Sequence, residues 1–464
     1  MLLVCNYFCN FAHIFIINKE KVMKHLRWII PLIVAAVLVA NSSCSPNHEL
    51  FNQEVTQAIS DSLSPVDSID KNHNWVLSES RNLTVTANAN VNAKWLKILT
   101  ADPHKSTDAE VATQVMIADG ETAVMTFCYP KTLTTLYAAL VDGNGLYTVT
   151  AFSPNDYKVD FSEPLYTRQI ISYIPQPQVF VFCYEEEMPD YTNLNFDYND
   201  VVMSIAYERT DEREIRFHVW LDAVGTDHPM SAALHLKNFK YNEIDTVYTV
   251  GGGSFNVNSK GEEIPDQVVS ANLLRTKELL LKSQSQEKEE DREAVINLFC
   301  DAHWATGDLL TMNDVRLIDR KRYNVSKGSS DDYKTMVPKE VTYVVKFKEK
   351  RGLEYLTFDL IDPFIIKEYL GGTFEVHQYA YRNDWVFKNY RIGEIDQLPW
   401  ALVIPYKKFR HPLEGVNIGF KKKDIQGFGA YSRVNGHTFG EWSMNHNLAQ
   451  DWYLNEYATE NQVY

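Results

Sequence analysis

Three short runs decide the fold: Gln178-Val-Phe-Val-Phe-Cys-Tyr184, Glu185-Glu-Glu187 and Asn195-Phe-Asp-Tyr-Asn-Asp-Val-Val-Met-Ser-Ile-Ala-Tyr207. The first run is apolar almost throughout, which is typical of a buried strand. From Val201 the third run puts apolar side chains on one face, which predicts a second strand. Pro189 and Asp190 indicate a loop between the two strands. We therefore expect two strands that bring two sets of oxygen-bearing side chains toward one loop.

The side chains at the ends of these strands suit a hard cation, because calcium takes six to eight oxygen ligands in proteins. The candidate ligands are Glu185, Glu186, Asp197, Asn199 and Asp200. An EF-hand is excluded, because no Gly holds the sixth loop position and Ser204 stands at the twelfth. The pattern predicts a calcium site of the strand-loop-strand type. A turn whose Asp and Asn side chains cap their own backbone is the alternative.

This region resembles the LruC-domain family of bacterial secreted or lipid-anchored proteins. The resemblance rests on motifs that stand in the family's order, from Gln178 to the C-terminus: Glu185-Glu186, Asp197-Tyr-Asn-Asp-Val-Val202, Asp362-Pro-Phe-Ile365, Glu375-Val-His377, Pro399-Trp-Ala-Leu-Val-Ile-Pro405, Pro412-Leu-Glu414 and Glu441-Trp442. The resemblance implies a fold and a compartment rather than an activity.

The N-terminus has the features of a targeting segment, which we assign to residues 1–43. Lys24, His25 and Arg27 form a positive region, and the apolar run Trp28–Ala40 follows it. Small residues then precede Cys44, as in a lipoprotein signal, so Cys44 is the predicted lipidation site. A signal anchor, or cleavage by the ordinary signal peptidase, is the alternative.

Two starting points for the chain are open. Met23 directly precedes the positive region, so we expect translation to begin there. The apolar stretch Met1–Ile17 would then lie outside the protein, and the alternative is a second hydrophobic hairpin.

The remaining chain is expected to be mainly β, with two β-sandwich or jelly-roll-like domains. Residues 44–74 are polar and predict a tether. Residues 75–165 carry short alternating strands and a hairpin turn at Asp142-Gly-Asn-Gly145, which predict a first sandwich. Residues 170–464 are expected to form the LruC-like domain. It is interrupted by a helical or charged insert at about 265–300.

Composition excludes several classes of function. The formal charge of the chain is −16 and no basic stripe occurs, so nucleic acid is not an expected partner. Cys128, Cys183 and Cys300 have apolar neighbours, which favours buried free thiols, and no Cys-x-x-Cys pair suggests a zinc site. The sequence lacks a phosphate-binding loop, a Gly-x-Ser-x-Gly elbow and a His-Glu-x-x-His motif.

Three functions are consistent with these features. The first is a non-catalytic lipoprotein of the outer membrane, anchored through its lipid, with a structural calcium site and a role in adhesion or surface organisation. The second is an accessory protein that binds glycans through exposed aromatic residues; Trp400, Trp442, Trp452, Tyr453 and Tyr457 are available, although their apolar neighbours favour core packing. The third is a glycoside hydrolase with Glu185 and Asp200 as paired carboxylates. We expect the first, with a glycan or a surface protein as possible partner.

Overall fold

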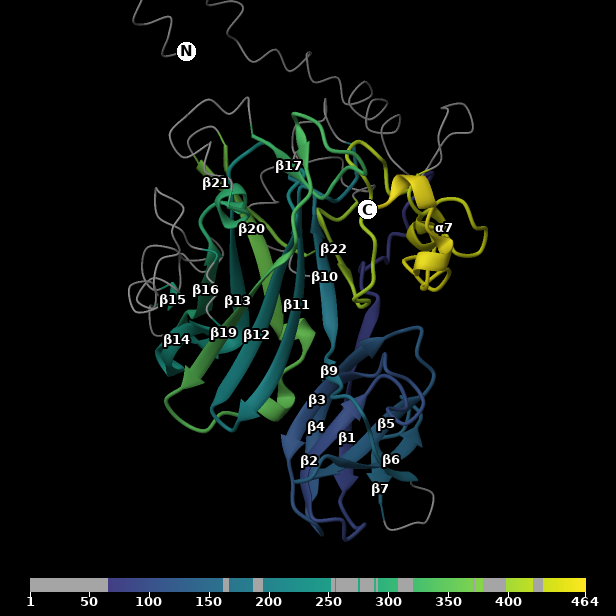
Figure 1. The fold of residues 1–464 in the computed structure, drawn as a ribbon, viewed down its shortest axis with the longest axis vertical. Helices are drawn as coiled ribbons and strands as arrows, with labels where there is room; N and C mark the ends of the chain where they lie inside the picture. Colours follow the sequence, from purple (N-terminus) through teal and green to yellow (C-terminus); the bar gives the residue numbers. More distant parts are fainter. Residues whose placement is uncertain are drawn as a thin grey trace, which may run out of the picture. The chain divides into compact units, whose positions relative to one another are not determined.

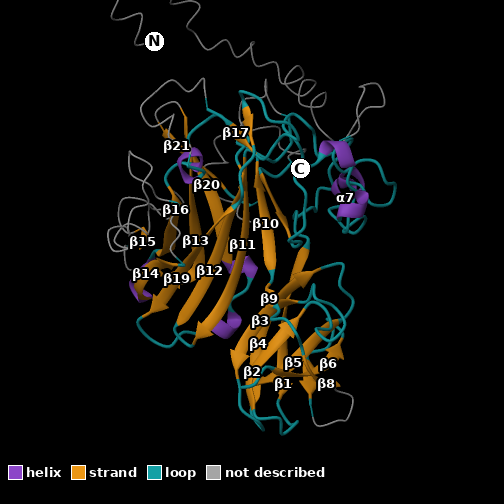
Figure 2. Cartoon of the chain, viewed as in Figure 1, coloured by secondary structure: helices purple, strands orange, loops and turns teal. Residues whose placement is uncertain are grey.

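Alternating side chains along short segments produce an all-β protein, as predicted (Figure 2). The computed structural model describes residues 66–161, 167–186, 195–251, 255, 274–275, 288, 291–307, 320–369, 372–378, 398–419 and 429–464. All of them belong to one compact unit, Leu63–Tyr464. The predicted signal segment, Cys44 and most of the predicted insert lie outside the described residues.

The first sandwich is built from two sheets with the strand orders β4-β1-β7 and β8-β6-β5-β2-β3-β9. Its strands are β1 (Ser78–Thr86), β2 (Ala93–Leu99), β3 (Glu110–Met116), β4 (Thr122–Pro130), β5 (Leu136–Asp142), β6 (Leu146–Phe152), β7 (Lys158–Asp160), β8 (Thr167–Ile170) and β9 (Gln176–Pro177). Leu83, Leu96 and Phe127 are among the residues that bury its core. The predicted hairpin joins β5 to β6, where Gly145 has the positive φ that the turn requires.

The second sandwich packs a sheet of order β14-β19-β12-β11-β10-β22 on a sheet of order β15-β16-β13-β20-β21 (Figure 1). Its strands are β10 (Val179–Tyr184), β11 (Val201–Asp211), β12 (Glu214–Ala223), β13 (Met230–Lys240), β14 (Ile244–Val250), β15 (Leu274–Arg275), β16 (Glu293–Phe299), β19 (Lys339–Phe347), β20 (Ile361–Tyr369), β21 (Gly372–Val376) and β22 (Ala401–Ile404). Both sheets contribute to one core, with Phe217 and Val345 from the first and Leu234 and Ile296 from the second.

Short elements complete the described part of the second sandwich. The small sheet pairs β17 (Arg322–Tyr323) with β18 (Tyr333–Lys334). The helical segments are brief: η1 (Tyr241–Glu243), α5 (Ala302–Ala305), η5 (Leu353–Tyr355), η6 (Phe358–Leu360), α7 (Phe439–Met444), η8 (Asn455–Tyr457) and η9 (Glu460–Gln462). Among the described residues, no helix is both long and apolar enough to cross a membrane.

Several boundaries differ from those expected. The predicted tether 44–74 includes Val66 and His73, which are buried, and His73 Nε2 lies 2.9 Å from the carbonyl oxygen of Trp442. Trp75, expected in the first sandwich, packs against Trp442 in the core of the second. Contacts of His73 and Trp75 with Trp442 therefore hold this segment against the second sandwich, although its composition suggests a polar linker.

Two local predictions were also wrong. Residues 293–299 of the predicted helical or charged insert form β16, because β13 offers a partner strand and Ala294, Ile296 and Leu298 fill the core. Cys300 is exposed, whereas Cys128 and Cys183 are buried free thiols as predicted.

Candidate functional site

The candidate site lies where β10 ends and β11 begins. These strands are antiparallel, and Tyr184 pairs with Val201 at the end of the ladder. Glu185 therefore leaves one strand beside Asp200, which leads into the next. The backbone N–H of Glu186 donates to Asp200 Oδ2 at 2.5 Å, which joins the two ends of the loop. The structure thus brings the ends of the two expected strands together, and the metal-binding role of the five residues stays a prediction.

All five predicted ligands are buried, which is unusual for so many acidic side chains. Glu185, Asp197 and Asn199 are 0 % exposed, Glu186 is 1 % exposed and Asp200 is 6 % exposed. We call the group Glu185, Asp197, Asn199, Asp200 and Glu414 the acidic cluster. Glu414 joins it because its charge, like that of Glu185, raises the pKa of Asp197.

Burial and mutual repulsion both act on the acidic cluster. Loss of hydration is the largest cause that raises the pKa of Asp197 and of Asp200 well above the usual range, and the neighbouring charge of Glu185 comes second for both. Each carboxylate thus disfavours the ionisation of the others. Glu414, at the edge of the cluster, also lies 3.5 Å from Arg322 Nε. Among the residues that the structure describes, this arginine offsets only part of the negative charge, and an added cation would neutralise more of it.

Two oxygens of the cluster have no hydrogen-bond partner among the residues that the structure describes. They are Asp197 Oδ1 and Asn199 Oδ1, both buried. The other polar atoms of these side chains are engaged: Gly415 N–H donates to Asp197 Oδ2 at 2.7 Å, and Asn199 Nδ2 donates to the Pro412 carbonyl at 3.1 Å. Buried polar atoms normally find partners, so these two oxygens are available to a ligand.

Gly225 provides the room beside Asn199. A Cβ at this position would lie 2.1 Å from Asn199 Oδ1 and 2.6 Å from the Asn199 carbonyl oxygen, so any other residue would force the loop to move. The Gly225 N–H also donates to the Asn199 carbonyl at 2.9 Å. No local sequence pattern points to Gly225, because its role depends on a contact between distant segments.

Glu186 differs from the other predicted ligands, because the protein supplies its countercharges. Its carboxylate forms an ion pair with Lys367 of β20, and it lies 2.6 Å from His228 Nδ1. The Thr226 hydroxyl donates to Glu186 Oε1 at 2.6 Å. Burial by itself would raise the pKa of Glu186, but the His228 hydrogen bond and the Lys367 charge lower it. Glu186 is therefore paired within the protein, although its charge also raises the pKa of Asp200.

The donor set fits a hard cation, because it consists of carboxylate and amide oxygens with backbone carbonyls nearby. No three His, Cys, Asp or Glu side chains of the described part of the chain are already gathered tightly enough to enclose a metal ion. The described carboxylates therefore do not form a ready-made metal site.

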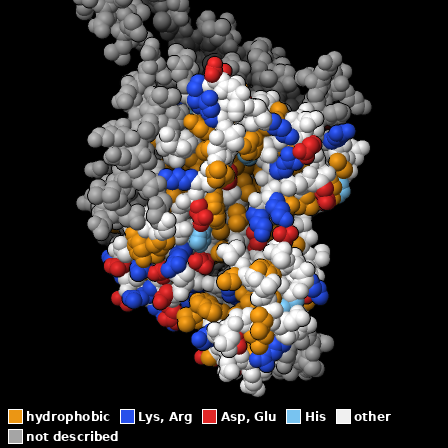
Figure 3. Space-filling model, in the orientation of Figure 1, with side chains coloured by type: hydrophobic (Ala, Val, Ile, Leu, Met, Phe, Trp, Pro, Cys, Tyr) orange, Lys and Arg blue, Asp and Glu red, His pale blue; other side chains and the backbone are white. Residues whose placement is uncertain are grey.

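The aromatic residues considered for glycan binding belong to the core. Trp400, Trp442, Trp452 and Tyr453 are at most 2 % exposed, and only Tyr457 is partly exposed. The prediction that their apolar neighbours favour core packing is confirmed. On the face drawn in Figure 3, Lys and Arg side chains are interspersed with Asp and Glu. That face shows no continuous basic surface.

Comparisons with known proteins bear on the second sandwich. The family model described as a domain of unknown function, DUF4842, matches residues 213–442. This range includes Gly225 and Glu414 but none of Glu185, Glu186, Asp197, Asn199 and Asp200. The LruC resemblance is not tested by this match and stays a prediction.

Among solved structures, a candidate lipoprotein from Bacteroides ovatus is similar to 79 % of this chain and 99 % of its own, with 15 % identity and a TM-score of 0.44. A likeness at this level carries no argument about function. No curated protein matches this chain. The chain is thus similar, over residues 213–442, to a family whose function is undefined.

Proposed function

We propose that this chain is a non-catalytic, lipid-anchored protein of the outer membrane that uses calcium to stabilise its second sandwich. Its role would be adhesion or organisation at the cell surface, with a glycan or a surface protein as partner. The observation that carries the calcium proposal is the acidic cluster, in which buried carboxylates raise one another's pKa and two buried oxygens have no partner among the described residues.

The electrostatics of the acidic cluster support a divalent cation. Burying ionised carboxylates without enough countercharge is costly, and the cost falls when a cation is shared among them. Calcium accepts irregular sets of carboxylate, amide and carbonyl oxygens, whereas magnesium demands a nearly ideal octahedron. Asn199 and the neighbouring backbone provide the neutral oxygens.

The calcium proposal is tested by thermal unfolding with calcium and with chelator. A ligand that binds only the folded state stabilises it by about 2.7 kcal/mol at a hundredfold excess over Kd. We expect a higher Tm for the unmodified chain in calcium, and Asp200→Ala should remove most of this shift. Asp245→Ala is the control, because Asp245 is an exposed residue of β14 and should leave the shift unchanged.

Two results would contradict the calcium proposal. One is a single Tm for the unmodified chain in both buffers. The other is an equal loss of stability by Asp200→Ala with calcium and with chelator, since this is what a turn that caps its own backbone predicts.

The environment of Glu185 and Asp200 supports the non-catalytic assignment. A glycosidase needs two carboxyl groups that face a sugar, with an open position for water in the inverting class. Glu185 is fully buried and Asp200 nearly so, and Asp200 Oδ2 accepts a backbone hydrogen bond. A substrate would have no access to the pair without a rearrangement of the loop.

The lipid anchor is tested separately at Cys44, which lies outside the described residues. Metabolic labelling with a fatty acid should mark the unmodified chain. Cys44→Ala should abolish the label and leave an unprocessed precursor, and Cys128→Ala is the matched control with labelling retained. Persistent labelling of Cys44→Ala would show that the anchor is elsewhere.

A further inference from the structure

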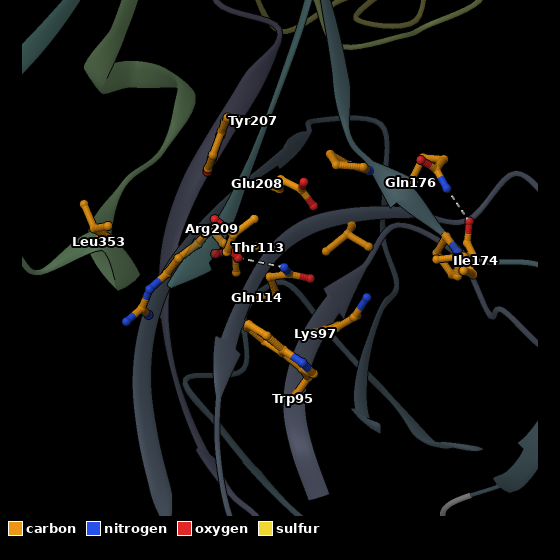
Figure 4. Close-up of a pocket in the computed structure, with 14 residues that line it drawn as sticks. Trp95, Lys97, Thr113, Gln114, Ile174, Gln176, Tyr207, Glu208, Arg209 and Leu353 are labelled. Atoms are coloured by element: carbon orange, nitrogen blue, oxygen red, sulfur yellow. Dashed lines mark hydrogen bonds between the residues drawn. The ribbon is translucent and has the colours of Figure 1, made fainter. Parts of the chain in front are cut away.

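A cleft of about 310 Å³ lies where the first sandwich meets β11 of the second (Figure 4). Trp95 and Lys97 of β2, Gln114 of β3 and Glu208 and Arg209 of β11 line it. Gln114 Nε2 donates to the Arg209 carbonyl at 2.8 Å and so ties the two walls together. The volume is at the lower end of the range for small-molecule sites, about 300–1,000 Å³.

The charge of the Lys97 ammonium in this cleft is only partly offset by a neighbouring carboxylate. Burial lowers the pKa of Lys97, and the charge of Glu208 partly opposes this effect. Figure 4 shows the Lys97 ammonium directed into the space below Glu208. Among the described residues no ion pair to Lys97 occurs, and its ammonium lies 6.0 Å from the centre of the Tyr147 ring.

The other charges of the cleft already have partners. Glu208 lies 3.6 Å from His218 Nε2, which lowers the pKa of its carboxyl group, and Arg209 lies 3.7 Å from Glu354. Glu208 also offsets part of the charge of Lys97, and Lys97 is the cation of the cleft that has no ion pair among the described residues. One carboxylate on a ligand would match it, whereas a phosphate group usually calls for two or more cationic donors or backbone amides.

The remaining lining suits a ring that is apolar on its faces and polar at its edge. Half-buried Trp95 and the prolines Pro175 and Pro177 offer apolar surface, and Thr113, Gln114 and Gln176 offer hydroxyl and amide groups. An added peptide strand is disfavoured, because β9 already pairs with β3 at Glu110 and Val111. We propose that this cleft binds a short saccharide that carries a carboxylate, of the uronic acid class, with Lys97 on the carboxylate and Trp95 against a sugar ring.

The probes are a galacturonic acid trisaccharide and the neutral galactose trisaccharide of the same linkage, titrated into the full chain by calorimetry. The acidic trisaccharide should bind at least tenfold more tightly, because a charge-assisted hydrogen bond is lost with the neutral one. Lys97→Met should weaken the acidic probe by about tenfold or more. Lys94→Met is the matched control, because Lys94 is an exposed residue of the same strand and does not line the cleft.

Hydrogen exchange on the unmodified chain locates the ligand without any substitution. The acidic trisaccharide should slow exchange in β2 and in β11. The proposal is overturned by absence of binding, by equal affinity for the two trisaccharides, by equal losses in Lys97→Met and Lys94→Met, or by protection confined to other strands. Tighter binding of an acetylated Asp-Glu peptide would also overturn it. None of these outcomes depends on the calcium proposal, since both titrations are run in the same buffer.

Discussion

Two buried groups of charged side chains in the second sandwich, the one around Asp362 and the acidic cluster, differ in the charges that surround their carboxylates. On the second sheet, Asp362 Oδ2 lies 2.8 Å from His377 Nδ1 and 3.4 Å from His235 Nδ1. The far nitrogens of the two rings face Glu375 and Glu293. We call these five side chains the histidine network. The acidic cluster, at the end of β10, is also largely buried, and among the described residues Arg322 is a cation beside it, 3.5 Å from Glu414.

The pKa values record this difference. Burial raises the pKa of Asp362, but the charge of His377 and the hydrogen bond with His235 outweigh it, so the pKa is lowered. Asp197 and Asp200 have only carboxylates as the neighbours that matter most, and their pKa values are raised. The comparison teaches that histidines balance the buried carboxylate of Asp362, whereas the neighbouring carboxylates of the acidic cluster raise the pKa values of Asp197 and Asp200, which is why the calcium proposal is tested there.

The largest expected effect is on the histidine network. Asp362→Asn removes the charge that both rings share, and breaking a buried ion pair in this way costs about 3–5 kcal/mol. Urea unfolding should show this loss equally with calcium and with chelator. A loss that depends on calcium would mean that the two groups are coupled and that the comparison fails.

A smaller effect is expected at Gly225. Gly225→Ala places a Cβ 2.1 Å from Asn199 Oδ1, and overpacking of this kind costs about 1–3 kcal/mol. It should also weaken calcium binding, because it displaces a candidate ligand. Gly328→Ala is the matched control, since nothing lies within 4 Å of its added Cβ, and its stability should hardly change. Unchanged calcium affinity in Gly225→Ala would remove Asn199 from the ligand set.

The last expected effect is a pH dependence of stability, because a group whose pKa changes on folding links the free energy of unfolding to pH. Burial lowers the pKa of His377, but the Asp362 charge outweighs burial and raises it to about 10. Its stabilising contribution is fully present below the ordinary value of 6.5 and is lost as the pH rises toward 10. The contribution of Asp362, whose pKa is lowered, is present above 3.8 and lost as the pH falls below it.

In the acidic cluster the raised pKa values of Asp197 and Asp200 mean that, in chelator, the folded chain holds protons more tightly than the unfolded chain. This stabilisation is fully present below 3.8 and declines as the pH rises. Under the calcium proposal the ion would bind the ionised carboxylates, so its stabilising effect should grow between about pH 5 and about pH 8. Unfolding curves at both pH values, with calcium and with chelator, measure the difference. A calcium effect that shrinks over this range would contradict the assignment.

Sequence patterns predict what depends on neighbours along the chain. Alternation along Val201–Tyr207 indicates β11, and the apolar run before Glu185 indicates β10, so the meeting of Glu185 with Asp200 could be expected. Gly225 and Glu414 could not, because they reach the site from other segments.

The histidine network could not be predicted for the same reason. Local sequence suggests only that a histidine such as His377 sits on a strand with a satisfied partner. Strand β20 pairs with β13, which carries His235, and with β21, which His377 follows, and these two pairings bring both rings to Asp362.

Residues of the first sandwich show the same limit. Trp95 and Lys97 look like ordinary strand residues in an alternating run, so the sequence assigns no chemistry to that domain. Their cleft exists only because β11 lies opposite. Trp75 was expected in the wrong sandwich, since its partner Trp442 follows it by several hundred residues and no local pattern reports such a contact.

Strand β10 lies between β11, which follows it directly, and β22, which is synthesised much later. The Tyr198 hydroxyl donates to the Pro399 carbonyl across 201 residues of sequence. A nascent chain that has not yet reached Ala401 therefore carries β10 as an edge strand with unpaired N–H and C=O groups, a template for aggregation. Contacts so distant in sequence also slow folding. Chains truncated before Ala401 should consequently aggregate readily and depend on chaperones. Synthesis of the four residues Ala401–Ile404 provides the strand that pairs with this edge of β10.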